Sequence, residues 1–246
     1  MENKLKKNIP NAVTCCNLIS GCIATYFAFT GQLHLALVWI IIGALFDFAD
    51  GLTARLLNVS SPIGKELDSL ADDITFGLAP SAMVFTELRV MDYPFMNESD
   101  SVQRFLLPFV AMVMAAFSAV RLAKFNIDTR QKTSFIGLPT PANALFWGSL
   151  IATKSHWLES SPWMTAGVVV MIFVSSWLMV AEIPMFALKF KHWGWRGNEI
   201  RYIFLILSAV VLALSGVLGS MWIIITMYFC ISLAAAKDIK QKEAAE

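Results

Sequence analysis

The sequence predicts an all-α integral membrane protein: a bundle of about eight transmembrane helices in which residues 1–246 form a single domain. Three observations support this fold class. Hydrophobic residues make up 57% of the chain and charged residues 15%, against about 45–50% and about 25% in soluble domains. The mean hydropathy is +0.63. Long apolar runs recur, and basic residues gather in alternate gaps between them. This excludes a secreted disulfide module, a disordered chain and an ordinary cytosolic enzyme.

Eight apolar runs account for the predicted helices, because crossing the bilayer takes about 20 mostly apolar residues and lipid requires each segment to satisfy its own backbone groups. The first run resembles a signal peptide, but it is too long, lacks a small-x-small cleavage pattern and is followed at once by a second run, so we expect it to be retained. The fifth run is the shortest and opens with two prolines. In chain order the runs cover residues 12–30, 33–56, 67–90, 102–124, 139–153, 163–187, 199–218 and 220–236.

The basic residues predict the orientation, because Lys and Arg are retained on the cytoplasmic side of a membrane. Eight spans put both termini on one side, and that side would hold 16 of the 19 basic residues. We therefore expect a multi-pass protein of the inner or plasma membrane with cytoplasmic termini. The minority side holds Arg89, Arg104 and Lys154; the majority side holds Lys4, Lys6, Lys7, Arg55, Lys65, Arg121, Lys124, Arg130, Lys132, Lys189, Lys191, Arg196, Arg201, Lys237, Lys240 and Lys242.

The cysteines and the net charge indicate no further chemistry. The four cysteines lie in apolar stretches without the spacing of metal ligands, and we interpret them as small hydrophobic residues. The formal net charge is +1, and we expect no nucleic-acid partner.

Four aspartates gather where the second run ends and the third begins, within residues 47–73. Asp47 and Asp50 are three residues apart and share one helix face. Asp68 and Asp72 are four residues apart and share another. Because consecutive helices are antiparallel, the four carboxylates are predicted to converge at the inner membrane surface.

Such a cluster needs positive charge, and ionisable residues in membranes indicate function by default. Arg55 and Lys65 supply only two charges. Hard divalent cations prefer oxygen ligands, so a pair of metal ions fits the four carboxylates. The alternative is that these are solvated charges at helix ends. Asp68 at a helix N-terminus fits that alternative, whereas Asp47 and Asp50 lie at the opposite, unfavourable end.

Neighbouring residues indicate a phosphate-bearing substrate. Gly51 and Ala54 have no bulky side chain, so a ligand can approach the helix backbone. Arg55 offers the bidentate contact that suits a phosphate. A joining loop that holds Pro62 and Gly64 would turn sharply at the glycine.

Eight of these residues resemble, position for position, the signature of the CDP-alcohol phosphotransferase family: Asp47-x2-Asp50-Gly51-x2-Ala54-Arg55-x8-Gly64-x3-Asp68-x3-Asp72. The segments IPNAVTCCNLISG (9–21), RLAKFN (121–126) and FIGLPTPANA (135–144) look like its membrane-embedded phosphatidylserine synthase subfamily, which adds spans to a six-helix core.

The resemblance implies a role for each signature residue. Asp47, Asp50 and Asp68 would bind two divalent cations, Mg²⁺ or Mn²⁺. Asp72 would complete the metal site and act as the general base. The CDP-lipid contacts would be Asn11, Thr14, Gly51, Ala54, Arg55, Ser61 and Gly64.

The resemblance also implies the reaction, which is transfer of a phosphatidyl group from CDP-diacylglycerol to the hydroxyl of L-serine, with release of CMP, by a homodimer. Arg121 at a helix end would bind the serine carboxylate, and Asn126 or Thr140 would orient its other polar groups. Two alternatives stay open. Another acceptor, such as glycerol-3-phosphate, suits the basic residues equally well. A transporter is the more remote alternative, because transporter sites lie near the midplane.

Overall fold

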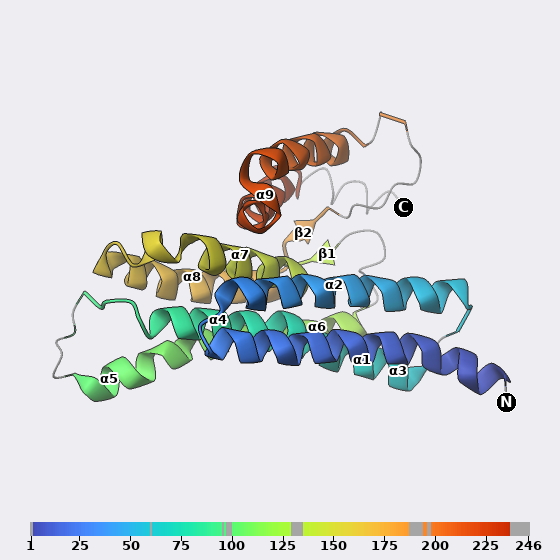
Figure 1. Ribbon diagram of the computed structural model, residues 1–246. Helices are drawn as coiled ribbons and strands as arrows, with labels where there is room; N and C mark the ends of the chain where they lie inside the picture. The colour runs from blue at the N-terminus through green and yellow to red at the C-terminus, as the bar shows by residue number, and fades with distance from the viewer. Residues whose placement is uncertain are drawn as a thin grey trace.

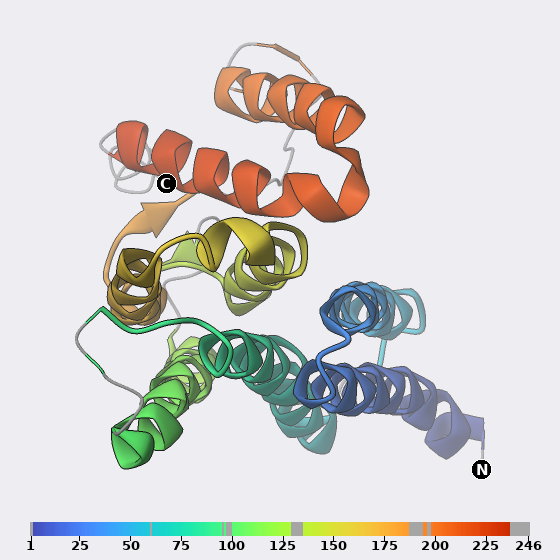
Figure 2. The ribbon, with the colours of Figure 1, turned by 60° about the vertical axis from the view of Figure 1, so that its left-hand side comes forward.

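The protein forms a bundle of helices that lie side by side (Figures 1 and 2). The computed structural model describes residues 2–59, 61–94, 96, 100–128, 135–186, 194–195 and 198–236, with side chains from residue 8 onward. Of the predicted basic positions, Arg130, Lys132, Lys189, Lys191, Arg196, Lys237, Lys240 and Lys242 lie outside these residues, as do the side chains of Lys4, Lys6 and Lys7.

Helical segments lie at each of the eight predicted ranges, and several of their ends differ by a few residues. The first half of the chain contains α1 (Glu2–Phe29), α2 (Leu33–Leu56), then α3 (Pro62–Asp72), the π-helix η1 (Asp73–Leu78) and α4 (Ala79–Leu88) as one continuous rod. The second half contains α5 (Ser101–Leu106), the 3₁₀-helix η2 (Leu107–Ala111), α6 (Met112–Ile127), α7 (Thr140–Leu158), α8 (Pro162–Val180) and α9 (Glu199–Ala234).

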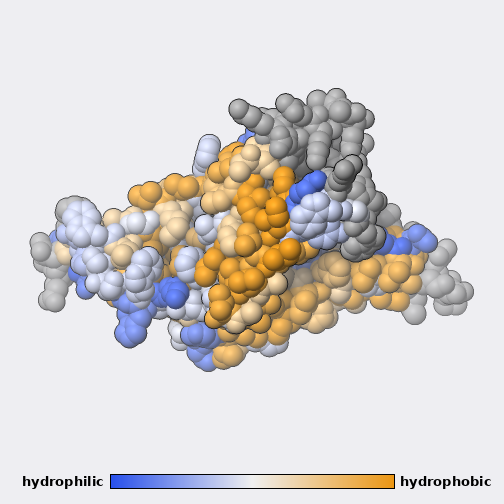
Figure 3. All heavy atoms as spheres, turned by 90° about the horizontal axis from the view of Figure 1, so that it is seen from above, coloured by the Kyte–Doolittle hydropathy of each residue, from blue (hydrophilic) through white to orange (hydrophobic). Residues whose placement is uncertain are grey.

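Among the described residues, five helices are long and apolar enough to cross a membrane, which confirms a multi-pass all-α membrane protein. They are Asn8–Phe29, Leu33–Leu56, Ser101–Ile127, Pro162–Val180 and Glu199–Ala234. Figure 3 shows the hydrophobic side chains along the middle of one face, with hydrophilic ones gathered near its left end. The rod 62–88 carries the acidic residues that lower its hydropathy, so the count of eight spans stays a prediction.

Helix α9 breaks at Gly216, three residues before residue 219, where the last two predicted runs were expected to separate. Gly216 has φ 67° and ψ 171°, which is not helical. A positive φ costs glycine little, because it has no Cβ. The chain changes direction here, and Figure 2 shows α9 as two rods that meet at an angle.

The predicted sixth run, 163–187, is too long. Helix α8 ends at Val180, four residues before Pro184, whose ring would clash with that carbonyl in a continued helix. Pro184–Met185 instead form β2, which pairs antiparallel with β1 (Phe135–Ile136). This short ladder ties the segment before α7 to the segment after α8.

The α2–α3 connection differs from the predicted loop. Asn58 has φ 50°, and the amides of Asn58 and Val59 donate to Arg55 O and Ala54 O, which closes α2 in the way glycine usually does. Ser61 then caps α3 by accepting from the Gly64 amide at 3.0 Å. Gly64 therefore lies inside the first turn of α3 and not in the loop.

The apolar core lies between α1, α2, α4 and α7. Fully buried side chains there include Leu37, Ile40, Met83 and Trp147. The Trp147 indole donates to Ser175 Oγ of α8 at 3.0 Å. This core fixes α1 against α2, and their shared end carries the candidate site.

Candidate active site

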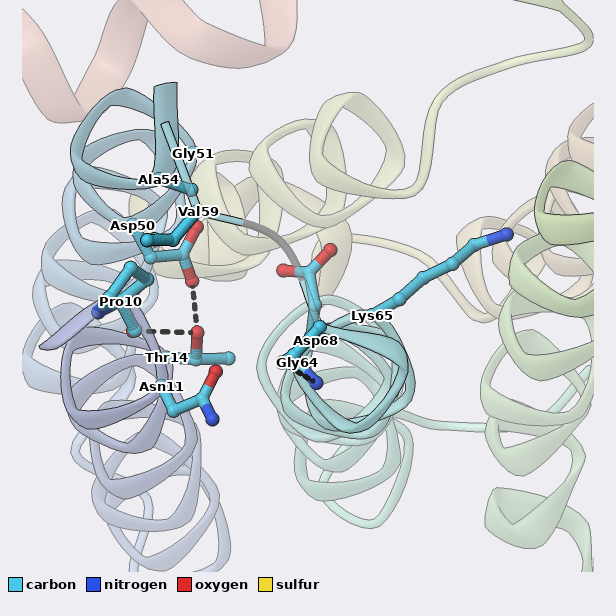
Figure 4. Close-up of a pocket in the computed structure, with 11 residues that line it drawn as sticks. Pro10, Asn11, Thr14, Asp50, Gly51, Ala54, Val59, Gly64, Lys65 and Asp68 are labelled. Atoms are coloured by element: carbon cyan, nitrogen blue, oxygen red, sulfur yellow. Dashed lines mark hydrogen bonds between the residues drawn. The ribbon is translucent and has the colours of Figure 1, made fainter. Parts of the chain in front are cut away.

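A cavity of about 270 Å³ opens between the ends of α1, α2 and α3. Figure 4 shows the polar side chains of α1 and α2 and the carboxylate of α3 around it. Its lining comes from three consecutive helices and the turn between two of them. The lining residues are Pro10, Asn11, Thr14, Asp50, Gly51, Ala54, Val59, Ser61, Gly64, Lys65 and Asp68.

Three of the predicted metal ligands meet beside this cavity. Asp47, Asp50 and Asp68 each offer a carboxylate oxygen, and these three oxygens lie within 4.8 Å of one another. Thr14 Oγ1 approaches Asp50 Oδ2 at 2.6 Å. A buried oxygen of Asp68, Oδ1, has no hydrogen-bond partner. An all-oxygen group of this size, with an unpartnered oxygen, fits a hard divalent cation.

Asp72 lies next to this group, one turn further along α3. It is buried, and it interacts electrostatically with Asp47, Asp68 and Asp50. Asn17 Nδ2 of α1 donates to Asp72 Oδ1 at 3.1 Å. Asp72 is not among the three residues whose oxygens meet within 4.8 Å, so its surroundings differ from those of the other three aspartates.

The structure brings six of the seven predicted CDP-lipid contacts to the cavity. Around Gly64 the packing is close, because a Cβ there would lie 2.8 Å from Asn11 Oδ1 and 2.9 Å from Ser61 Oγ. Arg55 is the exception. Its side chain is exposed and donates from Nε to Gly51 O at 3.0 Å, and it is not part of the lining.

Of the three predicted serine contacts, Arg121 lines a small cavity whose lining includes neither Asn126 nor Thr140. Arg121 is buried, donates from Nε to Leu138 O at 3.1 Å and interacts electrostatically with Asp72. Thr140 is buried, and its Oγ1 has no partner. Asn126 instead ties α6 to α3, because its Nδ2 donates to Ser69 Oγ at 2.7 Å and its carbonyl accepts from Lys65 Nζ at 2.7 Å.

The sequence analysis missed two kinds of site residue. Pro10 and Val59 line the cavity, but their side chains are apolar and nothing in the sequence marks them as site residues. Asn17 had a signal, since it is an amide inside an apolar run and lies three residues after Thr14, on the same helix face. A polar side chain in that position needs a hydrogen-bond partner, and Asp72 is that partner.

The part of the chain that matches known proteins contains the candidate site. Residues 7–188, which include the cavity and all four aspartates, match the family model described as CDP-alcohol phosphatidyltransferase. The chain belongs to the CDP-alcohol phosphatidyltransferase family. Membership accounts for the position-for-position match of the signature with residues 47–72.

Three curated relatives resemble this protein over more than half of its chain. A CDP-diacylglycerol–serine O-phosphatidyltransferase of Bacillus subtilis is 36% identical over 54% of this chain and 69% of its own length. One of Helicobacter pylori (strain J99) is 33% identical over 82% of this chain and 81% of its own. An archaetidylserine synthase of Methanothermobacter thermautotrophicus is 26% identical over 68% and 67%.

Proposed function

We propose that this protein transfers the phosphatidyl group of CDP-diacylglycerol to the hydroxyl of L-serine and releases CMP. Two findings support this activity together. A relative that carries the serine-transferase name is 33% identical to this protein over 82% of the chain. The acidic group lies beside a cavity at the end of the helices, where a nucleotide head group can enter while acyl chains remain in the lipid.

Asp47, Asp50, Asp68 and Asp72 would hold the divalent cations, which we propose to be two Mg²⁺ or Mn²⁺ ions. When bound, such cations offset negative charge on the pyrophosphate and on the departing CMP. The unpartnered Asp68 oxygen supports this assignment.

The protein's own groups would bind the donor and move the proton. Asn11, Thr14 and Ser61, with the open surfaces at Gly51, Ala54 and Gly64, would bind the CDP portion. Arg55 would contact phosphate from the rim. Asp72 would take the proton of the acceptor hydroxyl as that oxygen bonds to the lipid-side phosphorus and the bond to CMP breaks, since an unassisted hydroxyl is a weak nucleophile.

For the acceptor, we propose that Arg121 binds the serine carboxylate, with Thr140 or Asn126 orienting its remaining groups. Support comes from the buried guanidinium of Arg121, which interacts electrostatically with Asp72, and from the unpartnered Thr140 hydroxyl. The competing acceptor is a phosphorylated alcohol such as glycerol-3-phosphate. Its phosphate would suit the cationic side chains of Lys65 and Lys124 as well as the carboxylate of serine would.

One assay separates these acceptors. Purified protein with CDP-diacylglycerol should release CMP with L-serine and little with glycerol-3-phosphate, and Arg121→Ala should raise the KM for serine. Release with glycerol-3-phosphate and not with serine would refute the serine assignment and leave the family unaffected.

The cellular setting is part of the same proposal. We place the protein in the inner or plasma membrane as a homodimer, with its termini and active site facing the cytoplasm. The segregation of the basic residues in the sequence supports the orientation. CDP-diacylglycerol, L-serine and membrane lipid are the proposed partners.

A further inference from the structure

Asn17 is the polar residue of α1 that touches the proposed general base. Its side chain is fully buried, and Nδ2 donates to Asp72 Oδ1 at 3.1 Å across 55 residues of chain. Burying an amide inside an apolar helix costs free energy unless it is hydrogen-bonded. The bond to Asp72 satisfies the side-chain donor of Asn17, whereas Asn17 Oδ1 has no hydrogen-bond partner. Each of the two buried groups restricts where the other can lie.

The backbone of Asn17 is itself held by the π-helix that follows Asp72. Thr75 Oγ1 in η1 donates to Asn17 O at 3.1 Å. Thr75 also fits against a gap in α2, since a Cβ at Gly43 would lie 2.5 Å from Thr75 Cγ2 and 3.0 Å from Asn17 Oδ1. π-helical turns are rare and often occur at functional sites. Here the turn places Thr75 so that α1, α2 and η1 meet at Asn17.

We infer that Asn17 is a positioning residue for Asp72. Its amide occupies Oδ1 and leaves Oδ2 for the acceptor hydroxyl and the metal site. An amide suits this role, because it orients the carboxylate by a neutral hydrogen bond and adds no further positive charge beside a group that must accept a proton. The inference rests on the proposed function in one respect, the assignment of Asp72 as base.

The test uses the purified full chain and two substitutions. Asn17→Leu keeps most of the side-chain volume and removes the donor, and Asn17→Ala removes both. Both should lower kcat by about 10–100-fold while the KM for CDP-diacylglycerol stays within about twofold, because an orienting contact acts on the transition state. A packing role would instead spare the Leu variant. Thr25→Val on the same helix, whose hydroxyl donates only to Gly21 O within α1, should match wild type.

Two outcomes would overturn the inference. One is a kcat for Asn17→Leu within twofold of wild type. The other is loss of the thermal stabilisation that CDP-diacylglycerol with Mn²⁺ gives the protein, a measurement that needs no turnover and would assign Asn17 to donor binding. If wild type rejects serine, the proposed function fails, and the same comparison is made with the acceptor that does react.

Discussion

At the scale of single residues, the four aspartates are chemically unequal although the signature presents them alike. Asp50 is held by the Thr14 hydroxyl, and Asp72 by the Asn17 amide. Asp68 keeps an unpartnered oxygen. The spacing of the aspartates along α2 and α3 brings the carboxylates together. Hydrogen bonds from α1 then give individual carboxylates different surroundings.

The first prediction concerns Asp72. Asp72→Asn should abolish CMP release, because an amide cannot accept the proton, while the fold and much of the CDP-diacylglycerol binding remain. Turnover and lipid binding would be measured on the same detergent-purified sample. If the variant kept a tenth of wild-type turnover, another group would have to be the base.

Sequence reasoning found the aspartates and not their partners, and the reason is physical. Carboxylates three or four residues apart share a helix face whatever the tertiary structure. Asn17 and Asp72 are 55 residues apart, and their contact depends on how α1 packs against α3. Likewise, the exposed position of Arg55 depends on where α2 ends.

At the scale of elements, the turn between α2 and α3 sets the shape of the cavity. Asn58 closes one helix and Ser61 opens the next within a few residues. The approximate helix ranges were predictable from apolar runs, whereas this turn was not, because an asparagine took the role usually filled by glycine. The early end of α8 at Val180 was predictable from Pro184, but the β1–β2 pairing it permits was not.

The second prediction tests that shape. Gly64→Ala would place a Cβ within 3.0 Å of Asn11 and Ser61, so we expect the cavity to narrow and the KM for CDP-diacylglycerol to rise about tenfold or more. Alanine favours helices over glycine by about 1 kcal/mol, which offsets part of the strain of these close contacts, and a melting temperature measured beside the KM separates lost stability from a narrowed cavity.

The matched control is Gly167→Ala in α8, where a Cβ would meet nothing within 4 Å. Its KM should equal that of wild type and its melting temperature should be unchanged or higher. Equal KM values in the two variants would argue against close contact of the nucleotide with the first turn of α3.

At the scale of the whole molecule, the candidate site occupies one end of the bundle, and its acidic group and cavity come from α1, α2, α3 and the turn between α2 and α3. The fold class followed from the composition, and the spacing of the aspartates predicted which helix ends carry the candidate site. The number of spans and the oligomeric state did not, because both depend on packing against lipid or a second copy.

The third prediction is metal dependence. Exhaustive chelation should abolish turnover, and added Mg²⁺ or Mn²⁺ should restore it, because closely spaced carboxylates need cations both to coexist and to bind a pyrophosphate. Zn²⁺ should restore less turnover than Mg²⁺ or Mn²⁺, since no His or Cys joins the acidic group among the described residues. Undiminished activity after chelation would remove the metal assignment.

The fourth prediction is orientation, tested after the four native cysteines are replaced by alanine. Asp92→Cys, after α4, should react with an impermeant thiol reagent added outside intact cells. Ile127→Cys, at the end of α6, should react only after the cells are opened. The reverse pattern would place the active site on the outer face.

The break at Gly216 bears on how the chain enters the membrane. The two rods of α9 are joined through one non-helical residue, so almost no hydrophilic loop has to be carried through the hydrocarbon. At a helix centre, Leu, Ile, Phe and Val each favour insertion by about 0.3–0.6 kcal/mol, whereas each charged residue costs about 2.5–3.5 kcal/mol. Residues 202–234 contain no Asp, Glu, Lys or Arg. The last pair of helices can therefore leave the translocon together as a hairpin, with its turn moving through the lipid at little cost.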